Sequence, residues 1–178
     1  VQFMGEEQDN SAIDRSGDFW ILDPVDGTTN LIHDFRHSTL SLAYAEAGEV
    51  VLGKKLGENC KPGDIILLNG DLGVGKTVFT KGFGKGLGID EPICSPTFTI
   101  MQIYESGRLP LYHFDVYRIA DVCEMDEIGY EDYFFGNGVC LIEWAGLISE
   151  IIPDEHISVT IEKDLEKGFD YRNITIKE

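Results

Sequence analysis

An eight-residue stretch, GDLGVGKT at residues 70–77, has the residue types and spacing of a phosphate-binding loop. After an apolar run and before a helical pattern, it satisfies G-x-x-x-x-G-K-T with Gly70, Gly75, Lys76 and Thr77. Glycines let successive backbone N–H groups turn toward phosphate oxygens, and the positive end of the following helix dipole adds to them. In such a loop the lysine reaches the β and γ phosphates, and the threonine hydroxyl is a ligand of Mg²⁺. A glycine-rich turn before a helix is the alternative, but the flanking strand and helix favour nucleotide binding.

Two acidic residues end predicted strands downstream of this loop. Asp115 ends the segment LYHFD, and Glu143 ends the segment VCLIE. Because ligands of an open α/β sheet bind at the carboxyl ends of its strands, either carboxylate could complete a Mg²⁺ shell, directly or through water. The other interpretation is that each is a solvated acid. Arg118, three residues after Asp115, is a candidate for extra positive charge at the site or for a surface ion pair.

The segment SPTFTI, residues 95–100, combines a proline-fixed turn with hydroxyl side chains and an aromatic ring. This composition suits a loop that senses the γ-phosphate. It is equally typical of an ordinary entry into a strand.

A second, different chemistry is indicated near the start of the chain by WILDPVDGTTN at residues 20–30. Carboxylates two or three residues apart around a turn can hold two Mg²⁺ ions, which activate water and stabilise a leaving oxygen. As a bare turn, Asp-Pro-x-Asp-Gly carries little information.

The elements that must position these residues differ between the two parts of the chain. Up to about Gly53 the pattern is β-biased, with strands predicted at residues 19–22, 40–45 and 50–52 and a hairpin among them. A helical turn or two follows over Lys54–Cys60. Beyond it, strands alternate with helices, which predicts an α/β fold with a mostly parallel sheet and flanking helices. The strands are expected at 65–69, 111–115, 139–143, 157–161 and 172–176, and the helices at 77–87, 122–134 and 147–151.

Composition excludes several classes of protein. The formal net charge of −18 disfavours direct attraction to nucleic acid or to an anionic membrane. The four cysteines are scattered without a C-x-x-C pair, so we expect reduced, mostly buried thiols and no zinc site. No run of eighteen apolar residues and no leader pattern is present, which predicts a cytoplasmic protein with no membrane partner.

Four segments occur in the order in which they occur in the TsaE (YjeE) family, bacterial ATPases that assist threonylcarbamoylation of tRNA adenosine. These segments are LLNGDLGVGKTVFTKGFGKGLGI, SPTFTI, LPLYHFDVYRI and GVCLIEWAGLI, and the resemblance covers about residues 54–178. It implies a P-loop NTPase-like fold that binds ATP or ADP with Mg²⁺. It also implies action on the partner subunits TsaD and TsaB, with tRNA contacted only indirectly, which agrees with the acidic composition.

The same resemblance implies roles for particular residues. By this resemblance, Thr77 and Glu143 are expected to be metal ligands. Residues 95–99 are expected to be switch-like, and Asp115 and Trp144 are expected to be important for activity. Lys76, Asp115 and Glu143 are therefore expected to carry catalysis. Trp144, beside Glu143, is expected to line the crevice, although a core position is the commoner fate of a tryptophan. The expected nucleotide-binding set is Gly70, Asp71, Leu72, Gly73, Val74, Gly75, Lys76, Thr77, Val78, Thr97 and Trp144.

Residues from about 3 to 53 resemble an inner piece of the inositol monophosphatase family instead. The segments are GEE at residues 5–7, WILDPVDGTTN, and LSLAYAEAGEVVLG at residues 40–53. The resemblance maps Glu6, Asp23 and Asp26 to metal ligands and Gly27-Thr28 to a phosphate-binding turn. The family's third aspartate, in a W-D-x-A-x-G segment, is missing from this sequence. We therefore expect a vestigial second site with weak Mg²⁺ binding and no turnover, because such chemistry needs a preorganised ligand set.

The sequence thus predicts a fragment of a phosphatase-like protein at residues 1–53, followed by a TsaE-like P-loop ATPase domain at residues 54–178. The strands of the fragment at residues 1–53 are expected to replace the missing first elements of the ATPase. The leading hypothesis is an ATP-hydrolysing subunit that assists threonylcarbamoyl transfer to adenosine 37 of tRNA. The alternatives are a Mg²⁺-dependent inositol or sugar-phosphate phosphatase with an incomplete site, and an inactive chimera that only binds nucleotide.

Overall fold

The main sheet of the computed structural model has six strands in the order β5-β6-β7-β4-β8-β9. The structure describes residues 2–5, 19–26, 39–45, 51–163, 166 and 172–177. The four central strands run parallel, and β5 and β9 pair antiparallel at the two edges. The strands are β4 (Ile65–Asn69), β5 (Met101–Tyr104), β6 (Leu111–Asp115), β7 (Val139–Glu143), β8 (Ile157–Lys163) and β9 (Arg172–Lys177). The predicted α/β class is confirmed.

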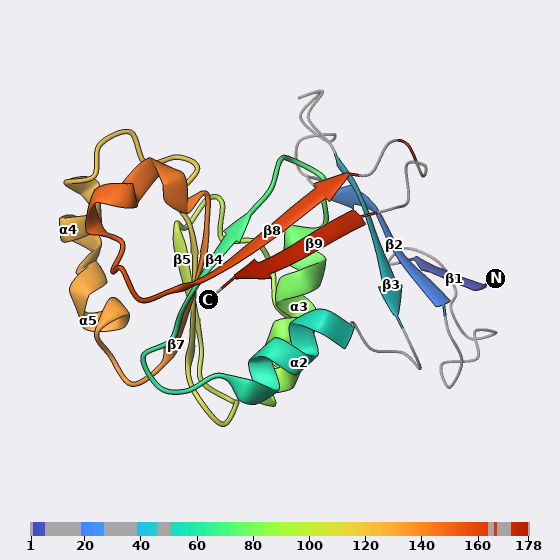
Figure 1. Ribbon diagram of the computed structural model, residues 1–178, viewed down its shortest axis with the longest axis horizontal. Coiled ribbons are helices and arrows are strands. Elements are labelled where there is room, and N and C mark those ends of the chain that lie inside the picture. The colour runs from blue at the N-terminus through green and yellow to red at the C-terminus, as the bar shows by residue number, and fades with distance from the viewer. Residues whose placement is uncertain are drawn as a thin grey trace.

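Helices cover both faces of this sheet (Figure 1). Alternate residues of β4 enter opposite cores, as the two-residue period of a strand requires. Ile66 and Leu68 pack with Phe79 and Phe83 on one face, whereas Ile65 and Leu67 belong to the core of the other face. The helices are α2 (Val51–Asn59), α3 (Lys76–Leu87), α4 (Glu124–Ile128), α5 (Tyr130–Phe134) and the 3₁₀ helix η1 (Ala145–Ile151).

The predicted helix at 122–134 is two short helices instead of one. Gly129 separates α4 from α5 with φ 70°, a left-handed conformation that glycine adopts without a steric penalty. The predicted helix at 147–151 is confirmed within η1, which begins two residues earlier and has 3₁₀ geometry.

Helix α2 replaces a predicted strand and packs against α3, the helix that follows the phosphate loop. Val51 and Leu52 form its first turn, so the strand expected at 50–52 is wrong, while the helical turns expected after Gly53 are confirmed. A Cβ on Gly53 would overlap the Phe79 carbonyl oxygen, and one on Gly57 would overlap that of Phe83. The two helices therefore pack at a separation that only glycine permits.

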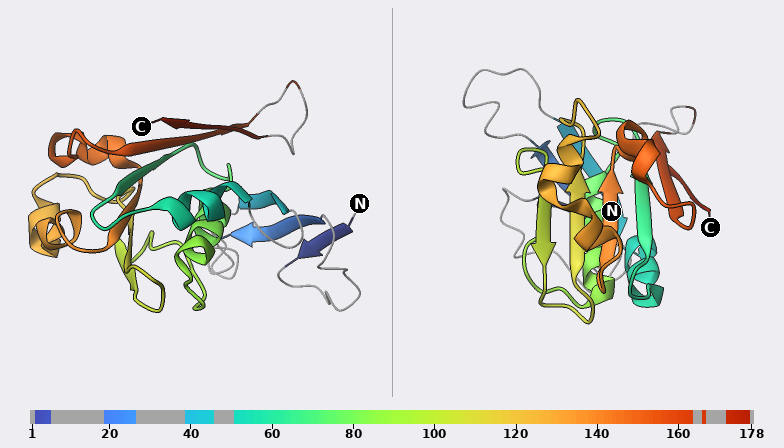
Figure 2. Two further views of the ribbon diagram at one scale, coloured as in Figure 1. Left: turned by 60° about the horizontal axis from the view of Figure 1, so that its bottom comes forward. Right: turned by 90° about the vertical axis from the view of Figure 1, so that its left-hand side faces the viewer.

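A small second sheet lies at the end of the molecule away from α4 and α5 (Figures 1 and 2). It contains β1 (Gln2–Gly5), β2 (Phe19–Asp26) and β3 (Thr39–Ala45), with β1 parallel and β3 antiparallel to β2. The strands predicted at 19–22 and 40–45 are confirmed. The register between β2 and β3 shifts between Asp23 and Asp26, the two aspartates of the predicted second site.

Candidate functional site

The phosphate loop joins the end of β4 to the start of α3, as the motif predicts. Gly70, Gly73 and Gly75 have φ angles of 151°, 68° and 105°, which L-residues with a side chain rarely adopt. At Gly70 a Cβ would also lie 2.6 Å from the carbonyl oxygen of Ile161 on β8. The first backbone hydrogen bond of α3 runs from Phe79 N to Gly75 O. The backbone N–H groups that precede Phe79 lie at the N-terminal end of this helix. This arrangement is suited to an anion.

Lys76 lies across the loop as a buried cation. Its Nζ donates to the carbonyl oxygens of Gly70 at 3.1 Å and Asp71 at 3.2 Å. The same atom lies 4.6 Å from the centre of the Trp144 ring, a cation–π contact. It also lies 3.9 Å from Glu143 Oε2, and only 7% of the lysine side chain is exposed. A positive charge is thus held where the phosphate loop opens.

Glu143 ends β7 and is almost fully buried. Its Oε1 atom lies 3.0 Å from Nε2 of His113, a histidine of β6 whose side chain has no exposed surface. One carboxylate oxygen therefore contacts a buried imidazole, and the other faces the ammonium group of Lys76.

Asp115 ends the neighbouring strand and is paired in register with Glu143. Its Oδ2 accepts hydrogen bonds from Thr97 Oγ1 at 2.5 Å and Ser95 Oγ at 3.2 Å, and its Oδ1 accepts one from Tyr117 N at 3.1 Å. The buried carboxylate thereby ties the predicted switch-like segment to the end of the sheet. Neither Asp115 nor Glu143 is the solvated strand-end acid of the alternative interpretation, because each is only 2% exposed.

The residue that directly follows the switch-like segment is strained. Ile100 has φ 65°, and a β-branched side chain is a genuine outlier in that region. Its N–H donates to Pro96 O at 2.7 Å, and its carbonyl oxygen accepts from Asp115 N at 2.8 Å. Such strain persists only where surrounding bonds impose it, and it is concentrated at ligand-binding and switch regions.

Trp144 and Arg118 contribute aromatic contacts near the loop. Trp144 has φ 63°, is half-buried, and its ring centre lies 5.0 Å from that of Tyr117. The guanidinium of the exposed Arg118 lies 4.6 Å from the centre of the Phe98 ring. Arg118 therefore packs on the switch-like segment.

The structure brings most of the predicted site residues together. The loop, Thr77 in the first turn of α3, Thr97, Asp115, Glu143 and Trp144 all lie at the carboxyl end of the sheet. Asp71 and Leu72 are exposed and Val78 is in the core, so their backbones are the parts that could contact phosphate. The groups of the predicted second site, which are Glu6 and the side chains of Asp23 and Asp26, lie outside the described part of the chain.

Two residues at the site were not predicted. His113 stands two residues before Asp115 in the same strand, so the period of a strand could have indicated that both face the same side. Arg172, at the start of β9, donates from Nε to the carbonyl oxygen of Val74 in the loop at 3.0 Å. No local pattern signals this contact, because 98 residues separate the partners.

The donor set fits a Mg²⁺ ion bound together with a nucleotide. Within the described residues, no three His, Cys, Asp or Glu side chains cluster as a self-contained metal site. Mg²⁺ usually keeps several waters and is bound by one or two carboxylates plus substrate phosphates. A hydroxyl at the start of α3 with carboxylates on two adjacent strands satisfies that requirement.

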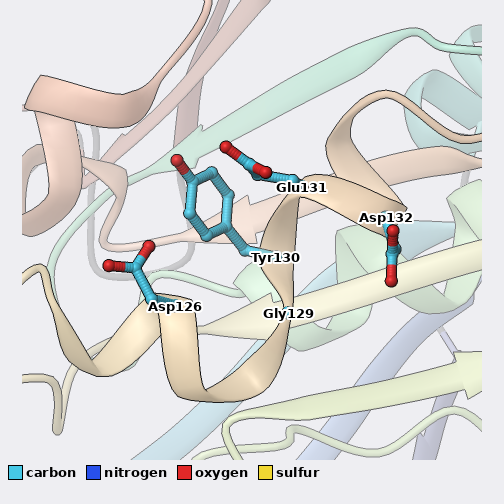
Figure 3. A pocket seen from close by; sticks show the side chains of 5 residues that line it. All are labelled: Asp126, Gly129, Tyr130, Glu131 and Asp132. Carbon is cyan, nitrogen blue, oxygen red and sulfur yellow. The ribbon is translucent and has the colours of Figure 1, made fainter.

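A pocket of about 320 Å³ lies elsewhere, on α4 and α5 (Figure 3). Its lining residues are Asp126, Gly129, Tyr130, Glu131 and Asp132. The carboxylates there would repel phosphate groups, so this pocket does not compete with the loop as a nucleotide site.

Two further predictions concern the thiols and the membrane. The expectation of mostly buried thiols is wrong for half of them, because Cys60 and Cys140 are buried while Cys94 and Cys123 are exposed; all four are free. Among the helices that the structure describes, none is long and apolar enough to cross a bilayer.

Comparison with known proteins matches the two parts of the chain to two families. Residues 45–174 match the family described as threonylcarbamoyl adenosine biosynthesis protein TsaE. Residues 1–54 match the inositol monophosphatase family.

Individual relatives share the larger match. The tRNA threonylcarbamoyladenosine biosynthesis protein TsaE of Bacillus subtilis is 54% identical over 115 residues, which cover 65% of this chain and 70% of that protein. The protein of the same name from Treponema pallidum is 41% identical over 109 residues, covering 61% and 80%. The crystal structure of YdiB from Bacillus subtilis superposes with a TM-score of 0.59 at 47% identity, covering 70% of this chain and 74% of that one.

Proposed function

Because this chain belongs to the TsaE family, we propose that it is the ATP-binding and ATP-hydrolysing subunit that assists threonylcarbamoyl transfer to adenosine 37 of tRNA. The observation that carries the proposal is the geometry of the loop. Three glycines with positive φ turn the backbone around an anion site, and the buried ammonium group of Lys76 lies over its opening. This is the arrangement that binds the phosphates of a nucleotide.

Thr77 and Glu143 are the residues proposed to hold Mg²⁺. When bound, the ion would neutralise charge that develops on the phosphates. Thr77 offers a hydroxyl from the first turn of α3, and Glu143 offers the carboxylate oxygen that now faces Lys76. The nucleotide phosphates would compete with Glu143 for the ammonium group of Lys76, because both carry negative charge.

Asp115 is proposed to couple hydrolysis to the switch-like segment. Its carboxylate already accepts hydrogen bonds from Ser95 and Thr97, so it can hold that segment beside the end of the loop. A change in the ligand at the loop would thereby reach residues 95–99, of which Phe98 and Thr99 are exposed. Trp144, in cation–π contact with Lys76, would form the adjacent wall of the site.

Hydrolysis is proposed to be slow without the partner subunits TsaD and TsaB. Phosphoryl transfer needs added positive charge at the transition state, and P-loop proteins often receive it from a partner. Arg118 packs on Phe98 and so is not directed at the loop by any described contact. Exposed apolar side chains on the loop, the switch-like segment, the residues after β6 and η1 support a protein contact at this end of the molecule: Leu72, Phe98, Tyr117 and Leu147.

The N-terminal residues 1–53 are proposed to be a phosphatase-like fragment attached to the ATPase domain 54–178. The match of residues 1–54 to the inositol monophosphatase family supports this division. Helix α2 runs across the proposed boundary, from Val51 to Asn59, so the two parts are joined by a continuous helix.

Calorimetric titration with ATP and ADP in the presence of Mg²⁺ tests the nucleotide assignment. Lys76→Ala should weaken binding by about a hundredfold or more, since it removes the charge-assisted contact to the phosphates. Lys85→Ala is the matched control, because Lys85 is exposed in the last turn of the same helix. Equal affinity in the wild-type chain and the Lys76→Ala variant would refute the assignment of the loop.

A further inference from the structure

We infer that His113 is a positioning residue that fixes the carboxylate of Glu143 for catalysis, an inference that rests on the ATPase function proposed above. His113 has no exposed surface, and its Nε2 atom lies 3.0 Å from Glu143 Oε1. It does not reach the loop itself through any described contact. Its effect on the reaction is therefore exerted through Glu143.

The sheet register places the imidazole beneath the two acidic residues of the site. Asp115 and Glu143 are paired across β6 and β7, and His113 precedes Asp115 by two residues. Residues two apart in a strand face the same side, so His113 lies one layer further from the strand ends. From there it meets Glu143 on the diagonal between neighbouring strands.

The two ring nitrogens of His113 have different surroundings. Nε2 lies 3.0 Å from a carboxylate oxygen of Glu143, a group that accepts a hydrogen bond from an N–H. The other nitrogen, Nδ1, is the one buried side-chain N or O atom in the described part of the chain that lacks a hydrogen-bond partner. An apolar side chain would avoid that orphaned atom. The polar contact that the imidazole provides here is the bond to Glu143.

The two carboxylate oxygens of Glu143 have different partners. Oε1 is held from below by His113, and Oε2 faces Lys76 at 3.9 Å. Without the imidazole the carboxylate can rotate and approach the lysine more closely. Second-layer groups that orient metal-binding side chains commonly change metal affinity or activity by about ten- to a hundredfold.

Three variants separate positioning from packing. In His113→Gln the amide nitrogen can occupy the position of Nε2 and donate to Glu143. In His113→Asn the shorter side chain reaches only the position of Nδ1. His113→Leu fills the buried space without any donor.

The measurements are kcat and KM for ATP with TsaD and TsaB present, the Kd for ADP, and the affinity for Mn²⁺ in the presence of ADP by electron paramagnetic resonance. We expect the Asn and Leu variants to lose about tenfold or more in kcat and in Mn²⁺ affinity, with the ADP affinity measured without metal unchanged within about threefold. The Gln variant should recover most of both losses. If the Leu variant does not fold, the comparison of Asn with Gln decides.

Wild-type kcat and Mn²⁺ affinity in His113→Leu, or equal values for the Asn and Gln variants, would overturn the role of His113. A wild-type chain that neither binds ADP nor hydrolyses ATP would instead overturn the proposed function, and the inference with it. The two failures are therefore distinguished by the wild-type measurement.

Discussion

The ammonium group of Lys76 and the carboxylate of Glu143 lie 3.9 Å apart inside the protein, with 7% and 3% of their side chains exposed. This pair occupies the point at which the phosphate loop meets the end of β7. A nucleotide phosphate would replace Glu143 as the partner of the lysine. The carboxylate proposed to hold Mg²⁺ and the cation proposed to bind phosphate are thus paired with each other.

Removing the charge of Glu143 should separate binding from hydrolysis. We expect Glu143→Gln to bind ADP as tightly as the wild-type chain or up to about tenfold more tightly, because a negative charge near the phosphates is removed. Hydrolysis should fall by about a hundredfold or more. Calorimetry and a phosphate-release assay measure the two effects. A variant that binds ADP about tenfold more weakly but hydrolyses ATP normally would contradict the assigned role.

The close approach of the α2 glycines to the backbone of α3 should contribute to the stability of the fold. Gly57→Ala places a Cβ against the Phe83 carbonyl oxygen, and overpacking of this kind costs about 1–3 kcal/mol in the free energy of unfolding. Urea unfolding followed by circular dichroism measures it. Gly146→Ala is the matched control, because a Cβ at that exposed glycine has no atom within 4 Å. Equal midpoints for Gly57→Ala and the wild-type chain would show that the helices can separate without cost.

Alkaline pH should destabilise the protein through the buried thiol of Cys140. Burial raises its pKa from 9.0 to about 12. Above pH 9 the unfolded thiol loses its proton while the folded thiol keeps it, so the unfolded state binds fewer protons and stability falls as pH rises. The expected slope from this one group is about 1.4 kcal/mol per pH unit.

Urea unfolding of the wild-type chain and of Cys140→Ser from neutral to alkaline pH measures this slope. The difference in stability between the two proteins should shrink as pH rises above about 9, and it should be constant at neutral pH, where the thiol is protonated in both states. Parallel stability curves over the whole range would contradict the burial of Cys140 as a thiol.

The inositol monophosphatase-like residues should not confer phosphatase activity. We expect no release of phosphate from inositol monophosphate above a buffer containing Mg²⁺, with a complete phosphatase of that family as the positive control. The double substitution Asp23→Asn with Asp26→Asn should leave ADP binding intact. Phosphate release that the double substitution abolishes would show that the second site is functional.

The central sheet was predictable from sequence because its strands are short apolar runs bounded by turn residues. Ile65–Asn69, Leu111–Asp115 and Val139–Glu143 have the predicted bounds. The edge strand β5 was not predicted, because three of its four residues are only partly buried or exposed, and it is held by antiparallel pairing with β6. Val51 and Leu52 resemble a strand locally, but they form the first turn of α2, whose glycines pack against α3.

The site was predictable where a local motif encodes it and unpredictable where distant segments meet. The loop was predicted from the spacing of Gly70, Gly75 and Lys76. In the structure both glycines have positive φ angles and Lys76 begins α3. The contact of Arg172 with Val74 depends on how β9 is paired with β8, and a sequence pattern does not encode that long-range contact. His113 lay within a recognised segment, but only the register of β6 and β7 brings it to Glu143.

The rate of ATP hydrolysis by the full chain, measured alone and with TsaD and TsaB, tests the proposed function most directly. We expect slow turnover by the chain alone and an increase of about tenfold or more with both subunits, since the missing positive charge would come from a partner. Asp115→Ala should abolish that increase while ADP binding stays within about threefold of wild type, because Asp115 contacts the switch-like segment through Ser95 and Thr97. Fast turnover by the chain alone, unaffected by TsaD and TsaB and by Asp115→Ala, would contradict the account.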